Sequence, residues 1–459
     1  MVLFLSELFI FTLLFKVMVF FNKFKFMIKN LLIMSLAVIL GSCCGSKEKK
    51  CANGQAEPAK ADSCPVAKFG KVDTASMNVE ILPAMAYPKG SPVDKWGKLK
   101  VAPNEKGVRS LCDQNGNPVQ LRGFSSHGMQ WSGVANITEE NMKALRNEWN
   151  CNIFRLAVYV DEEGGYAYNP THRSRYVENV VKWCAENGMY CLIDWHTLTP
   201  GNPQDAKYRN RPETGIDLAA DFFTYCSRRF QNQKHVLYEV CNEPNGVDFE
   251  NDKFGGSKWP DYNKPRITWN DFIKPYCEDM LKIIRSNDKD IVVICGTPHW
   301  SQRTHDVIGN EPADENGKVY DNLMYTFHFY AASHNDGRHD ETAVKFWDVD
   351  FMKYFAKGDS AKSVPCILSS LPVFVTEWGT TDASGWTNFR PDLADMWLDI
   401  FNGKNDGGQK VSWCNWSFSA EGGACTALKW NDGNMIPMDK KILTESGKYI
   451  YDRLRSAKD

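Results

Sequence analysis

The sequence predicts an α/β fold, a (β/α)8 TIM barrel with enlarged loops after its strands. From about residue 98 onward, short apolar runs that are typical of buried strands alternate with segments of helical periodicity. The apolar runs are continuous rather than alternating, which indicates a parallel sheet with both faces covered. Eight such runs, most of them separated by a helical segment, fit a closed eight-stranded barrel. A doubly wound open sheet is the alternative, but the Gly-rich phosphate-binding turn of that fold is missing from the sequence.

The barrel strands are predicted from runs rich in β-branched, aromatic and other apolar residues. They lie at 121–123, 153–159, 190–195, 236–241, 291–295, 323–329, 373–377 and 411–416. Three shorter strands ahead of them, at 98–101, 108–112 and 118–120, are expected to close the lower end of the barrel. Two long segments, 303–322 and 331–368, follow the fifth and sixth strands and are expected as loops on the face where a barrel keeps its active site.

The helices between the strands have their own signals. Thr138 is expected to cap the first of them, with two glutamates in the first turn near the positive end of the helix dipole. A second helix begins near residue 174 and ends at Gly188, where a left-handed residue is favoured. Two more, at 217–230 and 271–287, have apolar side chains at helical spacing.

The N-terminal residues 1–43 are predicted to be an export segment outside the fold. Residues 31–40 form an apolar run of signal-peptide length that follows three lysines. The sequence Leu-Gly-Ser-Cys then resembles a bacterial lipobox, and cleavage there would leave Cys43 as a lipidated first residue; a plain secretory signal is the alternative. We expect translation to start at Met27, with a transmembrane helix across 1–21 as the other interpretation.

Composition narrows the remaining organisation. Residues 44–85 are rich in Lys, Ala, Ser and Pro and are predicted to be a flexible tether, which leaves 86–457 for the barrel domain. The protein is expected in the bacterial cell envelope, held by its lipid at the outer membrane, cell surface or periplasm, or else secreted. A net charge of −2 gives no reason to expect binding to nucleic acid. The protein is expected to be a monomer, and to contact the membrane only through its lipid anchor. The 15 cysteines include no CxxC pair, and several lie in apolar strands, so we expect buried free thiols and no zinc.

Polar or aromatic side chains end seven of the eight predicted strands. Because the carboxyl ends of barrel strands surround one pocket, these side chains are expected to share it. A buried arginine and several buried histidines would otherwise each need a separate partner. In strand order the residues are His127, Arg155, His196, Asn242 with Glu243, His328 with Tyr330, Glu377 and Trp416.

Two glutamates are predicted to carry the chemistry. A pair of carboxyl groups across a cleft is the equipment for hydrolysing a glycosidic bond. Glu377 is predicted to be the nucleophile, kept ionised by Arg155 and Tyr330, and Glu243 the general acid that later acts as base. A separation of about 5–5.5 Å between the carboxyl groups would give retention, and a wider one inversion.

Six motifs in this order resemble glycoside hydrolase family 5, and its bacterial endoglucanase branch in particular. They are Leu-Arg-Gly at 121–123 with Ser-His-Gly-Met-Gln-Trp at 126–131, Asp-Trp-His at 194–196, Asn-Glu-Pro at 242–244, His-Phe-Tyr at 328–330, Thr-Glu-Trp-Gly at 376–379 and Ser-Trp-Cys-Asn-Trp-Ser at 412–417. The resemblance runs from about Pro92 to Lys429. Asn-Glu-Pro alone recurs by chance, whereas six motifs in the family's order are specific.

The resemblance implies a (β/α)8 barrel, retaining chemistry and β-1,4-glucan as the substrate. We expect the enzyme to be endo-acting and to need no metal or other cofactor. It places Glu243 as acid/base and Glu377 as nucleophile, with Trp416 beneath the sugar on the non-reducing side of the cleaved bond. Trp131 and Trp300 look like further sugar platforms, with core packing as the alternative. The other implied pocket residues are His127, Arg155, His196, Asn242, His328 and Tyr330.

Other functions stay open on the same barrel. A β-mannanase, or a hydrolase of mixed-linkage glucan or xyloglucan, would share the machinery at the strand ends. A non-catalytic carbohydrate-binding barrel is disfavoured because both glutamates are present. A metal-dependent hydrolase would need a motif such as His-x-His on the first strand, and the sequence has none there. The sequence departs from the family where a lysine usually follows the strand-eight tryptophan; here the next one is Lys429, so sugar binding on that side could differ. The enlarged segment 331–368 could reshape the leaving-group side of the cleft.

Overall fold

The computed structural model describes residues 79–130, 132–198, 201–211, 215–247, 262–336, 350–430 and 442–457, all within one compact unit of the chain, 69–459. The expected export segment with Cys43, most of the expected tether and Trp131 lie outside the described residues. The end of the expected tether is held to the barrel: the amide of Leu82 donates to the carbonyl of Arg229 at 3.0 Å, and Leu82 packs on the core. Within the described ranges, no helix has both the length and the apolar character needed to span a bilayer.

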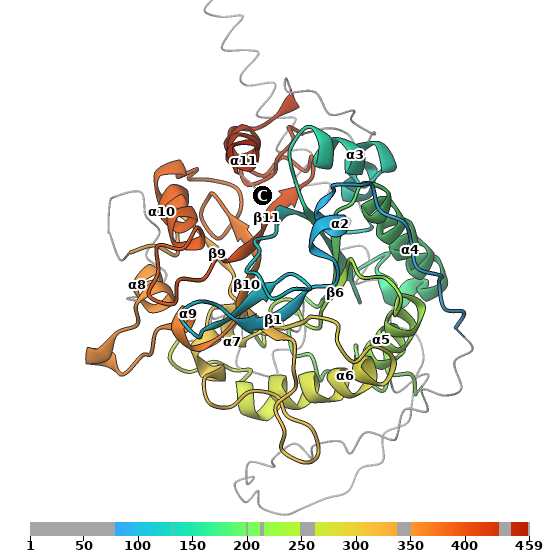
Figure 1. Ribbon diagram of the computed structural model, residues 1–459, viewed down its shortest axis with the longest axis horizontal. Helices are drawn as coiled ribbons and strands as arrows, with labels where there is room; N and C mark the ends of the chain where they lie inside the picture. The colour runs from blue at the N-terminus through green and yellow to red at the C-terminus, as the bar shows by residue number, and fades with distance from the viewer. Residues whose placement is uncertain are drawn as a thin grey trace, which may run out of the picture. The chain divides into compact units, whose positions relative to one another are not determined.

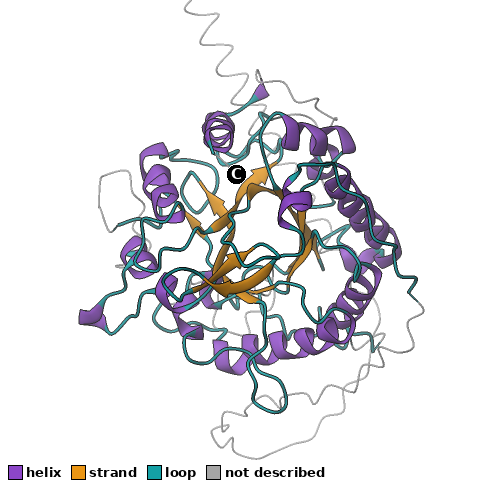
Figure 2. Cartoon of the chain, in the orientation of Figure 1, coloured by secondary structure: helices purple, strands orange, loops and turns teal. Residues whose placement is uncertain are grey.

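Eight parallel strands of the described chain close into a barrel, and helices surround it (Figures 1 and 2). The strands are β3 (Arg122–Ser126), β4 (Ile153–Tyr159), β5 (Tyr190–His196), β6 (Val236–Glu239), β7 (Val293–Cys295), β8 (Leu323–Thr326), β10 (Val373–Gly379) and β11 (Ser412–Phe418). Each pairs with the next along the chain, and β11 pairs with β3, so the ring is closed. The predicted (β/α)8 barrel is confirmed.

Two strands end earlier than the sequence predicts, because the chain leaves the sheet to form the site. β6 ends at Glu239 and β8 at Thr326. After β8 the amide of His328 donates to the carbonyl of Ser301 at 3.0 Å, and a further short strand, β9 (Phe329–Tyr330), pairs with β10.

Helices cover the outside of the barrel. Thr138 caps the first long one, its side chain accepting from the amide of Asn141 at 3.2 Å, and Gly188 has a φ of +64° just beyond the second, both as predicted. The α-helices are α2 (Pro92–Trp96), α3 (Glu139–Asn147), α4 (Pro170–Glu186), α5 (Leu218–Arg229), α6 (Lys274–Asn287), α7 (Pro298–Ser301), α8 (Phe351–Ala356), α9 (Ile367–Ser370), α10 (Pro391–Phe401) and α11 (Glu445–Ser456). Short helical turns are η1 (Ser132–Asn136), η2 (Tyr166–Tyr168), η3 (Trp269–Ile273), η4 (Thr304–Val307) and η5 (Ser360–Lys362).

The lower end of the barrel is closed by the segment before the first barrel strand. β1 (Lys100–Pro103) and β2 (Arg109–Cys112) form an antiparallel pair that lies over the barrel in Figure 1, whereas the third expected strand is reduced to a bridge between Cys112 and Pro118. Leu111 and its neighbours pack in one cluster with side chains from the starts of the barrel strands, such as Ile153. The plug predicted from the sequence is therefore present.

The prediction that the segment 303–322 is a loop on the active-site face is wrong for most of its length. It was expected on the active-site face, but only its beginning is near that face. Glu311 forms an ion pair with Arg109 of β2 at 2.5 Å, and the side chain of Asn322 accepts from the amide of Val101 at 2.8 Å. Since β1 and β2 close the lower end, this segment returns down the outside of the barrel to the start of β8.

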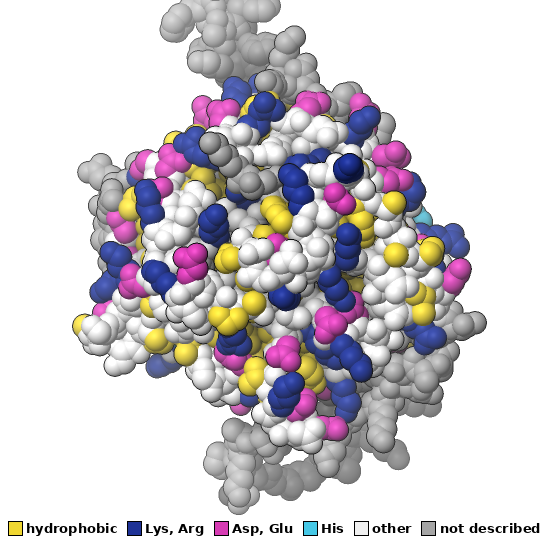
Figure 3. All heavy atoms as spheres, in the orientation of Figure 1, with side chains coloured by type: hydrophobic (Ala, Val, Ile, Leu, Met, Phe, Trp, Pro, Cys, Tyr) yellow, Lys and Arg dark blue, Asp and Glu magenta, His cyan; other side chains and the backbone are white. Residues whose placement is uncertain are grey.

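The core and surface agree with the composition. Eleven free cysteines are found in the described residues, and ten of them are buried, as expected for thiols that behave as small hydrophobic side chains. Figure 3 shows basic and acidic side chains mixed over the visible face rather than gathered by sign. This distribution is in keeping with the formal net charge of −2.

Candidate active site

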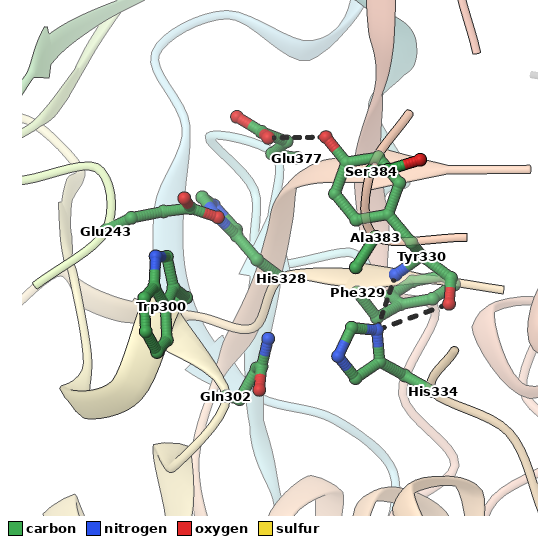
Figure 4. A pocket seen from close by; sticks show the side chains of 10 residues that line it. All are labelled: Glu243, Trp300, Gln302, His328, Phe329, Tyr330, His334, Glu377, Ala383 and Ser384. Carbon is green, nitrogen blue, oxygen red and sulfur yellow. Dashed lines mark hydrogen bonds and ion pairs between the residues drawn. The ribbon is translucent and has the colours of Figure 1, made fainter. Parts of the chain in front are cut away.

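The predicted polar side chains converge at the carboxyl ends of the strands. One carboxylate oxygen of Glu243, one of Glu377 and a ring nitrogen of His328 lie within 4.8 Å of one another. These three residues open into a cavity with a volume of about 280 Å³ (Figure 4). It is lined by Glu243, Trp300, Gln302, His328, Phe329, Tyr330, His334, Glu377, Ala383 and Ser384. The short distance between the two carboxylates leaves no room for a water nucleophile between them and the bond, which favours retention over inversion.

Arg155 is the centre of a buried ionic network. Its side chain is fully buried and makes a forked contact with Glu239, from Nε at 2.7 Å and from Nη2 at 3.2 Å. Nη2 also lies 2.9 Å from Asp194, and Nη1 lies 3.2 Å from Glu377. Burial alone would lower the pKa of Arg155, but the three carboxylates raise it, so its charge is fixed.

Glu239 and Asp194 were not among the predicted site residues. Asp194 lies inside β5, and Glu239, which ends β6, falls inside the longer strand expected over 236–241. Burial acts to raise the pKa of Glu239, but the charges of Arg155 and His328 outweigh it and bring the pKa to about 2. The signal that could have found them is an acidic residue within an apolar parallel strand, since a buried carboxylate requires a partner.

Two donors contact the carboxylate of Glu377. Arg155 donates to one of its oxygens, and the hydroxyl of Tyr330 donates to the other at 3.0 Å. The pKa of Tyr330 is raised far above its usual value, first by burial and then by the charge of Glu377, so the hydroxyl stays a donor. Both contacts are those expected from the sequence.

His328 is hydrogen bonded through both of its ring nitrogens. Its Nδ1 lies 3.0 Å from Glu243, and its Nε2 lies 2.8 Å from the hydroxyl of Thr376. That hydroxyl already donates to Glu239 at 2.8 Å, so it must accept from His328. Burial lowers the pKa of His328, but the bonds to Glu239 and Glu243 raise it to about 9. The same ring nitrogen and the two carboxylates lie within 4.8 Å of one another, close enough to surround an ion, and an ion there would have to displace a proton from His328.

His196 is neutral and fixed in orientation. Its Nδ1 donates to Asp194 at 2.6 Å, and its Nε2 accepts from the side-chain amide of Asn242 at 3.3 Å. Burial, followed by the charge of Arg155, holds its pKa well below the usual value. Asn242 in turn accepts from Arg155 at 2.7 Å, which fixes the direction of its amide group.

An aromatic group made by Trp416, His196 and His127 lies outside the cavity lining. Trp416 stacks on His196 with ring centroids 5.5 Å apart, and His127 lies 5.2 Å from Trp416. Nδ1 of His127 is 2.8 Å from a carboxylate oxygen of Glu421. Glu421 was not predicted, although it falls within the stretch where the sequence lacks the usual lysine of the resembled family.

Trp300 lines the opposite part of the site on an unusual backbone. His299, Trp300 and Ser301 have φ of 57°, 54° and 58°, a left-handed run that costs of the order of 1–2 kcal/mol per residue. The run is held by the Ser301 hydroxyl, which donates to the carbonyl of Asn242 at 2.8 Å, and by the Trp300 amide, which donates to the carbonyl of Pro244 at 3.1 Å. Since Trp300 lines the cavity, the core alternative does not apply to it.

His334 also lines the cavity, although it was not among the predicted site residues. Its Nδ1 accepts from the amide of Tyr330 at 2.9 Å, and burial lowers its pKa to about 4. A neutral ring whose Nδ1 accepts must carry its proton on Nε2. No strand-end signal marks His334, because it follows the end of β9 by four residues in a loop.

Comparison with known proteins agrees with this geometry. The family model described as Cellulase (glycosyl hydrolase family 5) matches residues 112–422. An endoglucanase of Clostridium saccharobutylicum is 34% identical over 354 residues, which are 77% of this chain and 64% of that protein, so the chain spans about two thirds of that relative. Cellulase CelDZ1 of Thermoanaerobacterium sp is 33% identical, over 78% of this chain and 82% of the relative.

Solved structures give the same picture. The catalytic domain of Thermobifida fusca endoglucanase Cel5A (E5) is 31% identical, covers 80% of this chain and 100% of its own, and superposes with a TM-score of 0.59. A variant of that domain in complex with cellotetraose is 30% identical, with the same coverage of both chains and a TM-score of 0.59.

Proposed function

The chain belongs to glycosyl hydrolase family 5, and on that premise we propose that it is a retaining endo-β-1,4-glucanase that cleaves internal bonds of cellulose-type glucans by double displacement. The observation that carries the proposal is the pair of carboxylates, Glu243 and Glu377, which line the cavity and bring one oxygen each within 4.8 Å of the other. The similar endoglucanases support the substrate class.

In the first step Glu377 attacks the anomeric carbon while Glu243 protonates the leaving oxygen. Glu377 suits the nucleophile's role because Arg155 and Tyr330 donate to its two oxygens and hold the carboxylate in place. Glu243 is the more exposed of the two carboxyl groups, with 14% of its side chain accessible against 6% for Glu377, so it can reach a leaving group that departs toward the cavity.

In the second step Glu243, now ionised, removes a proton from the water that releases the sugar from Glu377. The protonated His328, 3.0 Å away, stabilises this carboxylate. His328 is in turn balanced by Glu239, 3.7 Å from its other nitrogen, so the site does not carry an isolated buried charge.

The remaining residues hold the sugars. We assign His127, His196 and Trp416 to the glucosyl units on the non-reducing side of the bond, and Trp300 to the leaving-group side. Asn242, whose amide is oriented by Arg155 and His196, is assigned to the 2-hydroxyl of the reacting unit.

The test combines two variants with a product analysis. Glu243→Gln and Glu377→Gln should each lower kcat on soluble cellulose derivatives by at least about a thousandfold while oligosaccharide binding survives. Newly formed reducing ends should have the β configuration when followed by NMR, and chelators should leave the rate unchanged. Near wild-type turnover by either variant, or initial formation of the α product, would contradict the mechanism.

Substrate choice is tested with four polymers side by side. Carboxymethyl cellulose and lichenan should be cleaved internally, with a rapid fall in viscosity. A higher kcat/KM on mannan or xyloglucan would move the assignment to a mannanase or xyloglucan hydrolase on the same barrel.

The N-terminal segment supports a further proposal on location. We propose that Cys43 is lipidated and that the following residues tether a monomeric enzyme to the cell envelope. Labelling with a fatty-acid analogue in a bacterial host should depend on Cys43 and disappear in Cys43→Ser.

A further inference from the structure

Trp386 is a strongly exposed tryptophan close to the cavity. Its exposed fraction is 62%, although tryptophan is usually largely buried. It lies in the loop after β10, and two residues before it Ser384 lines the cavity together with Ala383. The chain between Ser384 and Trp386 can span at most about 7 Å. The amide of Trp386 donates to the hydroxyl of Ser384 at 3.2 Å, so the two residues are also joined directly.

The turn that carries Trp386 is built around a buried carboxylate. Asp382 is 4% exposed, and its oxygens accept from the amide of Ser384 at 3.0 Å and from the hydroxyls of Ser384 and Thr387. The amide of Asp382 donates to the carbonyl of Thr387 at 3.2 Å, which closes the turn beneath the tryptophan. The indole is therefore carried on a fixed turn.

Both sides of the turn are anchored to neighbouring loops. The amide of Ala383 donates to the hydroxyl of Ser333, in the loop after β9, at 2.9 Å. On the other side the carbonyl of Gly385 accepts from the amide of Cys425, in the loop after β11, at 3.0 Å. These two bonds tie the turn to the loops on either side of it.

We propose that Trp386 is a sugar-binding platform on the rim of the cleft, which takes a glucosyl unit of the leaving-group part of the chain beyond the unit that Trp300 contacts. Figure 4 shows Trp300 and Ser384 on opposite sides of the cavity, so a glucan that leaves the cavity past Ser384 reaches Trp386 next. A pyranose ring has a flat C–H face, and stacking it on an indole removes apolar surface of both from water. Because the turn is already ordered, little conformational entropy is lost on binding.

This inference rests on the proposed glucanase function, and the experiment separates the two. We would measure kcat/KM of wild type, Trp386→Ala and Trp386→Phe on cellohexaose and on an aryl β-cellobioside, whose leaving group ends within the cavity. Trp386→Ala should lower kcat/KM on cellohexaose about fivefold to tenfold and leave the aryl cellobioside within about twofold. Trp386→Phe, which keeps an aromatic face, should retain most of the cellohexaose activity.

Tyr168→Ala is the matched control, because Tyr168 is 63% exposed on the loop after β4. Tyr168→Ala should leave kcat/KM unchanged on both substrates. Both alanine variants should keep the wild-type melting temperature. The platform is refuted if Trp386→Ala affects both substrates equally or neither, if Trp386→Phe is as weak as Trp386→Ala, or if Tyr168→Ala shows the same selective loss. If wild type cleaves neither substrate, the glucanase function itself fails.

Discussion

Arg155 is the residue on which the charge balance of the site depends. One guanidinium contacts Asp194, Glu239 and Glu377, all of them buried. A lysine could not reproduce the forked contact with Glu239, because its ammonium group is a single point charge. The residue therefore serves structure and chemistry at once, and its replacement should affect both.

We predict that Arg155→Lys lowers kcat at least about a hundredfold and destabilises the fold by about 3–5 kcal/mol, because buried carboxylates lose their partner. Urea unfolding and steady-state kinetics measure the two effects. Arg209→Lys is the control, since Arg209 is equally buried and contacts Asp217 at 2.7 Å. It should destabilise the protein without a comparable loss of kcat in the fraction that is folded. Equal kinetic losses in both variants would mean that Arg155 has no special role at Glu377.

Glu421 should influence the choice between charged and neutral polymers. Its carboxylate contacts His127, which is next to Trp416, on the side assigned to the non-reducing part of the substrate. A carboxymethyl group bound there would be repelled by about 1 kcal/mol or less at several ångströms in a wet cleft.

We predict that Glu421→Gln raises the ratio of kcat/KM on carboxymethyl cellulose to that on lichenan about twofold to threefold at low ionic strength. The gain should vanish at about 1 M salt, where charges are screened within a few ångströms. Glu148→Gln, on the exposed end of α3, should leave the ratio unchanged. If the ratio changes with neither the mutation nor the salt concentration, Glu421 does not lie near the bound polymer.

Site residues can be predicted from the sequence when they lie at the end of a predicted strand. Glu243, Glu377 and His328 could be predicted because they follow apolar runs, and the barrel gathers strand ends into one pocket. Asp194 could not be predicted from position alone, since side chains inside a strand alternate between the interior of the barrel and its outside. Glu239 could not either, because the strand expected over 236–241 placed it inside, whereas β6 ends at Glu239. His334 and Glu421 escaped because loop conformation decides what a loop residue contacts.

Among the elements, β3 and β4 approach each other closely at Gly123. A Cβ atom on Gly123 would lie 1.9 Å from the carbonyl oxygen of Ile153 in β4. That oxygen belongs to the backbone of a paired strand and cannot rotate away. The glycine of the Leu-Arg-Gly motif is therefore required by the close approach of β3 and β4, whether or not the motif also has a role in the pocket.

We predict that Gly123→Ala destabilises the protein by about 3 kcal/mol or more, or prevents soluble expression, because the two strands must separate. Gly128→Ala is the control: its Cβ would meet only the end of the Gln130 side chain, at 2.9 Å, which can move. Thermal unfolding of the two variants should differ clearly. Equal melting temperatures would mean that the strands tolerate a wider spacing.

The long segments show where element-level prediction reaches its limit. Strands and helices follow from local periodicity, and the barrel followed from their order. The course of 303–322 did not, because it depends on distant partners such as Arg109, which pairs with Glu311. A segment without periodicity carries no local information about the end of the barrel to which it returns.

For the whole molecule, buried histidines set the pH range of stability in opposite directions. His328 has a pKa of about 9 in the fold, above the value of about 6.5 expected when unfolded, so its stabilising effect is complete below pH 6.5 and is lost as the pH rises toward 9. His235 and His334 have a pKa of about 4, lowered mainly by burial. They bind protons on unfolding between about pH 6.5 and 4, so acid destabilises the fold over that range.

We therefore predict a melting temperature that is highest near pH 6.5 and falls by several degrees toward both pH 4 and pH 9. His328→Asn should lose stability most below pH 6.5, and the difference from wild type should shrink as the pH approaches 9, since the wild type then loses the same interaction. His235→Asn should flatten the acid side instead, because one of the histidines that bind protons only on unfolding is gone. Calorimetry of the three proteins at matched ionic strength measures these slopes. A difference between wild type and His328→Asn that stays constant from pH 6 to pH 9 would mean that His328 is not charged in the folded protein, and the stabilisation of the Glu243 carboxylate during deglycosylation would then need another donor.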